Sequence, residues 1–191
     1  MNSLICGSPE ERDGFYSKLR ITPCPHCSAV GNLIRHGFLR GYNEERPPQK
    51  VIRAARVFCS NRDRATGCGR TFSVWMASRI RRLALSAESL WAFLSDAVST
   101  GNKWQAFAKL NCSLSGSAPY RIWRRFENAQ SAIRTTLSGL CEPPREPPRE
   151  LPKSAADSPA ANTLVHLQSA FDRHPLCPVA AFAVTLQTFF V

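Results

Sequence analysis

The sequence predicts an α+β fold, in which a small β ribbon precedes a mainly α-helical unit and a short C-terminal helical segment. Between Ile21 and Trp75 the chain is rich in cysteines and turn residues, with only short apolar runs. From Ala84 to Leu140 apolar residues recur at helical spacing instead. The change of period marks the boundary between the β and the α part.

Composition divides the 191 residues further. We expect a leader at 1–20, the ribbon at 21–78, a helical domain at 79–141, a proline-rich linker at 142–161 and a C-terminal helix with an apolar tail at 162–191. The linker repeats Glu-Pro-Pro-Arg, which favours extended polyproline II. The tail ends in Phe-Phe-Val and must pack on something, because such a run aggregates when exposed.

The charge points to a polyanionic partner. The net charge is +11, and only five of the 25 basic residues are lysine. Residues 20–82 alone hold thirteen basic residues against three acids. Arginine forks onto phosphate and onto guanine edges, which suits nucleic acid, although a GC-rich genome would also favour arginine codons.

Neither a signal peptide nor a membrane-spanning segment is evident. The N-terminus has no basic region followed by an apolar run, and the longest apolar stretch, from Pro178 to Val191, is too short to span a bilayer. We therefore expect a cytoplasmic protein, associated with the bacterial nucleoid and not with a membrane. In a reducing cytoplasm the eight cysteines are better explained by metal ligation than by disulfides.

Four cysteines have the spacing of a metal site. Cys24-Pro-His-Cys27 is a Cys-x2-Cys knuckle, and Cys59 and Cys68 supply a second pair, which together predict one structural zinc ion. The alternative is that Cys59 and Cys68 are buried free thiols. The second pair encloses eight residues rather than two, so we expect residues 60–67 to loop out and to present arginines at the tip.

These motifs resemble a known family. Cys24-Pro-His-Cys27, Leu33–Gly37, Arg56-Val-Phe-Cys59 and Cys68-Gly-Arg-Thr-Phe72 are similar to the N-terminal zinc ribbon of insertion-sequence transposases. The resemblance covers about residues 21–75 and departs from the family at a long Gly41–Arg53 hairpin loop and at the Cys59–Cys68 spacing. It implies DNA binding, for which the ribbon offers these candidates: Arg35, Arg40, Arg56, Arg62, Arg64 and Arg70.

The helical half begins at a serine cap. Ser86 is expected to start a helix that ends near Gly101, and Lys103–Leu110 a second, short helix with Trp104 inward. A third helix, Ala118–Ser138, carries an apolar stripe that should face inward: Ile122, Phe126, Ala129, Ile133, Leu137 and Leu140. The C-terminal segment should contain one more helix, at Thr163–Asp172.

A short helix, a turn and a helix with early arginines are the parts of a helix-turn-helix reader. Arg121, Arg124 and Arg125 are the candidates for base contacts, and Ser117 and Tyr120 for backbone contacts. The alternative is a plain three-helix bundle with a solvated arginine face.

We expect no enzyme activity. None of the fourteen acids ends a predicted core strand, and the chain has no room for the RNase H-like catalytic domain of transposases. The leading hypothesis is a zinc-dependent protein that recognises duplex DNA, as an accessory or regulatory factor of a mobile element. The alternatives are a subunit that binds RNA or single-stranded DNA, an adaptor whose apolar tail grips a partner protein, and a truncated transposase remnant.

Overall fold

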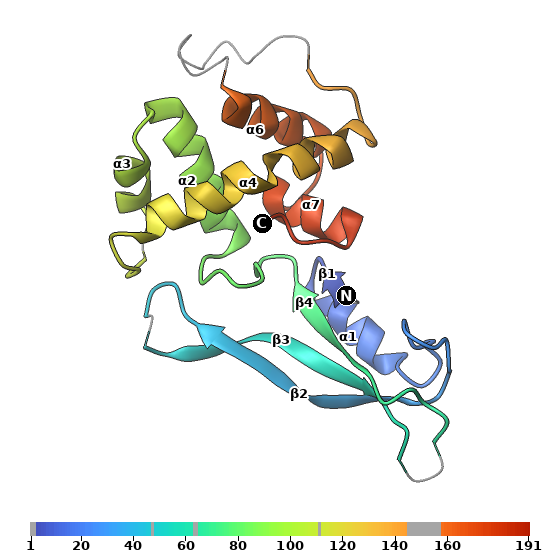
Figure 1. The fold of residues 1–191 in the computed structure, drawn as a ribbon. Helices are drawn as coiled ribbons and strands as arrows, with labels where there is room; N and C mark the ends of the chain where they lie inside the picture. Colours follow the sequence, from blue (N-terminus) through green and yellow to red (C-terminus); the bar gives the residue numbers. More distant parts are fainter. Residues whose placement is uncertain (1–2, 47, 63–64, 111, 145–157) are drawn as a thin grey trace.

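The computed structural model describes residues 3–46, 48–62, 65–110, 112–144 and 158–191. It confirms the α+β class: a four-stranded sheet lies on one side of the molecule and a group of helices on the other (Figure 1). The elements are β1 (Ser3–Cys6), α1 (Pro9–Ser17), β2 (Leu33–Tyr42), β3 (Lys50–Cys59), β4 (Thr71–Met76), α2 (Ala87–Thr100), α3 (Lys103–Ala108), α4 (Ala118–Ser138), α6 (Pro159–Ala170) and α7 (Pro178–Leu186).

The sheet has the order β1-β4-β3-β2 and is mixed. β2, β3 and β4 pair antiparallel, whereas β1 joins the edge of β4 in parallel. The β2–β3 ladder continues to the pair Tyr42 and Lys50, so the loop of this hairpin is much shorter than the expected Gly41–Arg53 loop. The residues expected as a leader supply β1 and the helix α1, and therefore belong to the sheet region; a four-residue strand is too short to recognise by its period.

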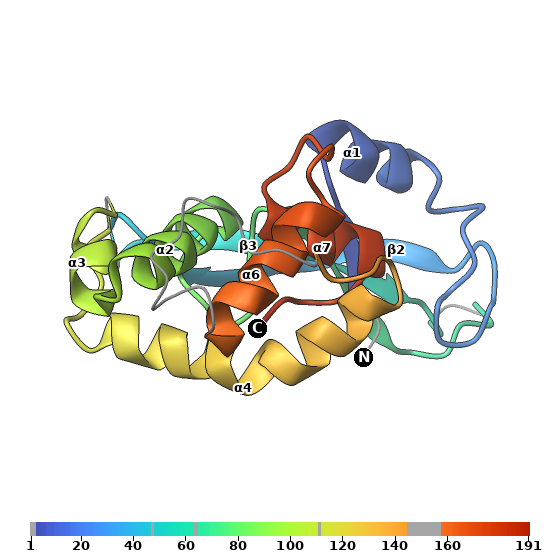
Figure 2. The same cartoon turned by 90° about the horizontal axis from the view of Figure 1, so that it is seen from above.

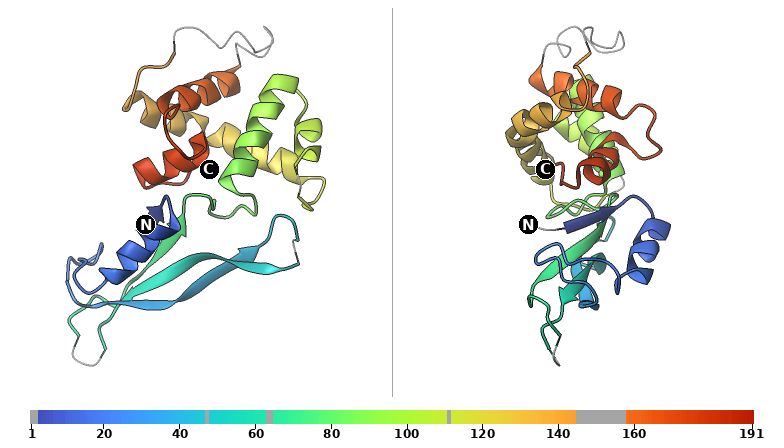
Figure 3. Two further views of the ribbon diagram at one scale, coloured as in Figure 1. Left: turned by 180° about the vertical axis from the view of Figure 1, so that it is seen from behind. Right: turned by 90° about the vertical axis from the view of Figure 1, so that its right-hand side faces the viewer.

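The two faces of the sheet pack into two cores. Ile5 and Trp75 face the helices, while Cys6, Phe72 and Val74 on the same two strands pack with α1 and the cysteine region. This alternation follows from the period of two in a strand. The α1 helix packs with the second core, and in Figure 3 it lies beside the strands, below the group of helices from α2 to α7.

The helices α2 and α4 lie where apolar periodicity and capping residues predicted them. Ser86 accepts a hydrogen bond from the backbone N–H of Ser89, and Gly101 ends α2 with a left-handed backbone. The inward stripe of α4 is confirmed apart from its last residue, since Leu140 follows the helix end and is 47% exposed. Trp104 was wrongly expected inside; it is 53% exposed.

The C-terminal segment packs within the chain. It forms α6, which starts four residues earlier than expected, and a further helix, α7. Phe190 is buried against Phe126, with ring centroids 6.0 Å apart, and Phe189 meets Trp75 at 5.3 Å. Seen from above, α6 and α7 lie between α4 and α1 (Figure 2). Most of the expected polyproline linker, residues 145–157, lies outside the described residues.

The side chain of Gln187, just after α7, behaves like a strand neighbour of β1. Its amide oxygen accepts from the N–H of Ile5 at 2.9 Å, and its amide nitrogen donates to the carbonyl of Ile5 at 2.9 Å. One side chain thereby occupies both backbone groups of Ile5. None of the described helices is both long and apolar enough to cross a membrane.

Candidate metal centre and basic surfaces

The four predicted ligands converge. The Sγ atoms of Cys24, Cys27, Cys59 and Cys68 all lie within 4.8 Å of one another. The Cys24–Cys68 and the Cys27–Cys59 sulfur pairs are each 3.8 Å apart. A tetrahedral zinc ion with Zn–S bonds of about 2.3 Å requires sulfurs about 3.8 Å apart. The cluster therefore has the size of one structural zinc site.

The first pair lies on the loop between α1 and β2, in a tight turn. The N–H of Ser28 donates to the carbonyl of Cys24 at 2.8 Å, and Ser28 has a left-handed backbone with φ +61°. The N–H of His26 points at the Sγ of Cys24 at 3.4 Å. Such N–H···S contacts stabilise a thiolate and orient it toward the ion.

The second pair repeats this turn in spite of its long spacing. Cys59 ends β3, and the N–H of Cys68 points at its Sγ at 3.4 Å. The N–H of Gly69 donates to the carbonyl of Cys59 at 3.0 Å, and its φ of +70° is a left-handed backbone that favours glycine directly after this ligand.

The insertion between the second pair is closed at its base by Gly67. Its N–H donates to the carbonyl of Ser60 at 2.9 Å. A Cβ atom at Gly67 would lie 2.1 Å from that carbonyl oxygen and 2.7 Å from the Sγ of Cys59. The insertion therefore loops out without separating the ligands. Sequence reasoning missed Gly67, and its place directly before Cys68 was the available signal.

The thiols differ in their tendency to ionise. Burial raises the pKa of Cys59, whereas a hydrogen bond from the backbone N–H of Ala29 lowers the pKa of Cys27. Zinc binds thiolates, so loading this site would displace protons. Cys24 and Cys59 are buried beside Leu33, and four thiolates fill a tetrahedron, which is typical of a structural rather than a catalytic zinc.

The predicted nucleic-acid residues fall into two groups at opposite ends of the β2–β3 hairpin. β2 has ten residues, which corresponds to about 30 Å. Near the cysteines, which we call the zinc end, lie Arg35, Arg56, Arg62 and Arg70. At the other end, next to the start of α4 and called the junction end, lie Arg40, Ser117, Tyr120, Arg121, Arg124 and Arg125. Arg64 lies outside the described residues.

Two arginines of the zinc end stack on aromatic rings. The guanidinium of Arg35 lies 4.4 Å from the ring centroid of Tyr16, and that of Arg62 5.6 Å from Phe58. Arg56 is half-buried, while Arg70 is exposed. Arg35 and Arg62 are also exposed, so stacking orients these charges without removing them from solvent.

At the junction end the arginines of α4 have different roles. Arg121 and Arg124 are exposed, and Arg121 donates to the Oγ of Ser115 at 3.1 Å. Arg125 is half-buried and donates to the carbonyl of Arg82 at 3.1 Å. Burial and the nearby charge of Arg82 lower the pKa of Arg125. Arg125 thus links α4 to the loop before α2 by one hydrogen bond.

The other two candidates of this group lie at the start of α4. Ser117 occupies the N-cap position but makes no capping hydrogen bond with its side chain, and Tyr120 is 59% exposed. α3 ends at Ala108 and α4 begins at Ala118. This connection is longer than the three or four residues typical of a helix-turn-helix, which therefore stays a hypothesis.

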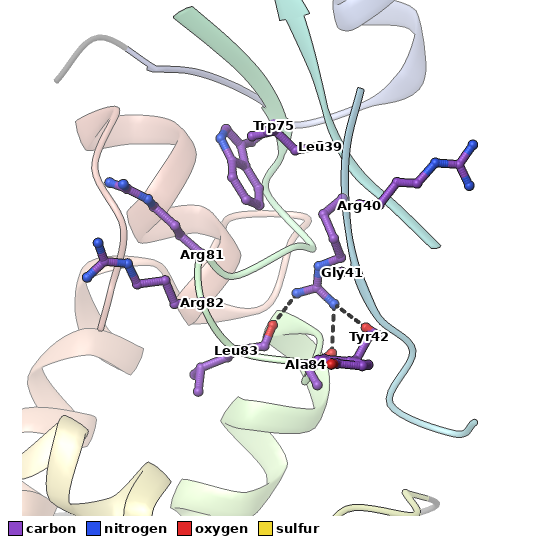
Figure 4. A pocket seen from close by; sticks show the side chains of 10 residues that line it. Leu39, Arg40, Gly41, Tyr42, Trp75, Arg81, Arg82, Leu83 and Ala84 are labelled. Carbon is purple, nitrogen blue, oxygen red and sulfur yellow. Dashed lines mark hydrogen bonds between the residues drawn. The ribbon is translucent and has the colours of Figure 1, made fainter. Parts of the chain in front are cut away.

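Arg53 is a structural residue that sequence reasoning missed. Only 5% exposed, it donates to the carbonyls of Tyr42 at 3.3 Å, Ile80 at 3.0 Å, Ala84 at 2.8 Å and Leu83. The dashed lines in Figure 4 mark the bonds to Tyr42, Leu83 and Ala84. These contacts fasten the loop between β4 and α2 to the sheet. An arginine in a strand gives no sign of burial, so no signal in the sequence pointed to it.

Few arginines are neutralised by acids. Within the part of the chain that the structure describes there are two ion pairs, Arg12–Asp13 at 2.9 Å and Lys109–Asp96 at 2.8 Å. The cations at both ends of the hairpin thus lack carboxylate partners among the described residues.

Comparison of the chain with models of protein families, with curated proteins and with solved structures gives no match. The geometry of the site is thus the basis for its interpretation. A four-cysteine cluster carried on a small β-sheet is a zinc-binding β module.

Proposed function

We propose that this protein is a zinc-stabilised nucleic-acid-binding protein that recognises duplex DNA. The observation that carries the proposal is the set of exposed arginines that have no acidic partner in the described structure. Such cations gain affinity by displacing counterions from phosphates. The resemblance of the ribbon motifs to transposases supports a role as an accessory or regulatory factor of a mobile element.

The first two turns of α4 are the proposed contact with bases. Arg121 and Arg124 are exposed there, and neither is paired with a carboxylate among the described residues. A guanidinium can donate two parallel hydrogen bonds to the edge of guanine. The proposed role of the zinc site is structural: it holds the ribbon, and we propose no catalytic step.

The test is titration of zinc-loaded protein against labelled 20-base-pair duplexes, single strands and RNA, after selection from random sequence. Arg121→Ala and Arg124→Ala should each weaken binding to the selected duplex about 5- to 100-fold and relax its sequence preference. Arg173→Ala, which removes an exposed arginine from the loop between α6 and α7, is the matched control and should change affinity little.

Absence of binding by the wild-type protein in about 0.1 M salt would refute the proposal. If the wild type binds but Arg121→Ala and Arg124→Ala keep its sequence preference, α4 does not contact the bases.

A second candidate is binding of single-stranded DNA or RNA. Phe38 and Tyr42 on β2 are each 60% exposed, and exposed rings can stack on unpaired bases. Phe72, the third ribbon aromatic, is buried and belongs to the core. Tighter binding of single strands than of duplex, lost in Phe38→Ala, would favour this candidate.

A further inference from the structure

Two cavities meet where the sheet joins the helices. One, of about 340 Å³, lies between β2, Trp75 and the loop before α2; the other, of about 420 Å³, lies between that loop and the start of α4. Both are lined by Tyr42, Arg82, Leu83 and Ala84, so the two cavities adjoin, and together we call them the junction cleft.

The walls of the junction cleft are cationic. Arg81 and Arg82 line the first cavity, and Arg82, Arg121 and Arg125 the second. In Figure 4 the side chains of Arg81 and Arg82 extend to the same side, whereas Arg40 points away from them. No aspartate or glutamate is among the described residues that line either cavity.

Two acids, Glu44 and Glu45, follow Tyr42 closely in sequence, and the first of them is bonded to α2. Glu44, two residues after Tyr42, accepts hydrogen bonds from the backbone N–H of Ser86 and from the Oγ of Ser89 at 3.1 Å. Its carboxylate is thus used at the start of α2. The like charge of Arg82 contributes, after burial, to the lowered pKa of Arg125.

Arg82 lies at the centre of the junction cleft on an unfavourable backbone. Its φ is +63°, in a turn in which the N–H of Leu83 donates to the carbonyl of Ile80 at 3.4 Å. L side chains rarely adopt this left-handed conformation, and glycine would adopt it readily.

The two ends of Arg82 are used differently. Its carbonyl accepts from Arg125, which fixes the turn against α4. Its guanidinium is exposed and makes no hydrogen bond or ion pair with any described residue. The side chain is neither buried nor bonded within the described structure, so the packing gives no reason for an arginine instead of glycine, and the guanidinium is available to a ligand.

We propose that the junction cleft binds the sugar–phosphate backbone of the nucleic acid, with Arg82 as the central phosphate contact and Arg81 beside it. The inference rests on the proposed function. Arginine can donate two hydrogen bonds to one phosphate, and the exposed ring of Tyr42, which lines both cavities, can pack on a sugar or a base. Residues of the sheet and of the helices line the cleft, so both parts of the molecule would contact the same ligand.

Arg82→Gly tests this inference, because it removes the charge while it relieves the backbone. The melting temperature of the variant should equal or exceed that of the wild type, since glycine fits φ +63°. Its affinity for the selected duplex should fall about 3- to 10-fold, with the slope of log K against log salt smaller by about one. Arg173→Ala should match the wild type in both measurements.

Arg82→Gln removes the charge but keeps a long L side chain. If Arg82→Gly folds poorly, the affinity of Arg82→Gln for the selected duplex is the test, and it should also fall. Arg82→Lys should restore most of the affinity. If the wild type binds the duplex and both uncharged variants bind equally well, the cleft is not a phosphate site although the proposed function stands. If the wild type binds no nucleic acid, both proposals fall.

Discussion

The zinc end and the junction end of the β2–β3 hairpin are held by different chemistry. At the zinc end the four sulfur atoms of Cys24, Cys27, Cys59 and Cys68 are placed to hold one zinc ion, which would fix the strands through its ligands. At the junction end one buried arginine, Arg53, binds four backbone carbonyls. Metal ligands can be recognised in a sequence by residue type and spacing. The backbone carbonyls that an arginine binds can be identified only from the fold.

The two ends also differ in electrostatics. Four thiolates outweigh the charge of one zinc ion, so the arginines near the cysteines are partly neutralised by the centre that they surround. The junction cleft has no such anion among its described lining residues. A charge count therefore cannot show where an anion would bind, because arginines surround a metal centre at one end and line a cleft without an acid among its described lining residues at the other.

The largest effect is expected from removing a zinc ligand. Cys59→Ser should lower the zinc-to-protein ratio from near one to near zero, since structural zinc contributes on the order of 10 kcal/mol to folding. Metal analysis with hydrogen exchange should show rapid exchange of β2 and β3, and slower exchange of α2 and α4. Cys112→Ser, at a cysteine outside the cluster, is the control and should keep the zinc. Full zinc occupancy in Cys59→Ser would contradict the metal site.

A smaller effect is expected at the other end from Arg53→Met. Loss of the guanidinium leaves the carbonyls of Ile80, Leu83 and Ala84 without their partner, at about 1–3 kcal/mol for each one left unsatisfied. Urea denaturation should show a loss of about 2–4 kcal/mol in total, after some rescue by water. The zinc ratio should not change. A zinc loss equal to that of Cys59→Ser would show that the two ends are not independent.

Gly67→Ala tests how strongly the close contact at the base of the insertion supports the zinc end. The added Cβ would collide with the carbonyl of Ser60, so we expect a loss of about 1–3 kcal/mol in unfolding free energy and weaker zinc binding in competition with a chromophoric chelator. Gly14→Ala, the same change in α1 where nothing lies within 4 Å of the new Cβ, should instead stabilise by about 0.5–1 kcal/mol. Equal changes in unfolding free energy at both glycines would contradict the close approach of Gly67 to the carbonyl of Ser60.

The smallest effect is expected from Gln187→Ala. It removes both hydrogen bonds to Ile5, each worth about 0.5–1.5 kcal/mol. The melting temperature should fall by a few degrees, and hydrogen exchange at β1 should accelerate. The zinc-to-protein ratio and the exchange rate of α4 should stay unchanged. Gln168→Ala, an exposed glutamine of α6, is the control. Unaltered exchange at β1 would show that Gln187 does not protect this strand.

Sequence reasoning succeeded where the chemistry is local. The Cys-x2-Cys knuckle, the serine cap at Ser86 and the regular stripe of α4 each lie within a few consecutive turns. The ligand pair Cys59 and Cys68 was found through the same residue-type argument, since few functions other than metal binding need four cysteines so placed. The α+β class followed from these elements.

What sequence reasoning missed depends on contacts between distant parts. β1 is recognisable only through its pairing with β4, and the burial of Arg53 only through a loop 27 positions away. The separation of the arginines into two groups follows from the length of β2, because neighbours in a charge count can lie at opposite ends of a hairpin. Arg82 has no sequence signal, since a left-handed backbone at arginine follows no composition rule.

The bonds between Gln187 and Ile5 have a consequence for the synthesis of the protein. They join residues 182 positions apart, so the edge of β1 stays open until nearly all of the described chain has left the ribosome. Contacts of such long range form late and make folding slow. The sheet that carries the metal centre is therefore expected to reach its final form only after translation of α7, and a nascent chain must keep an unpaired strand soluble until then.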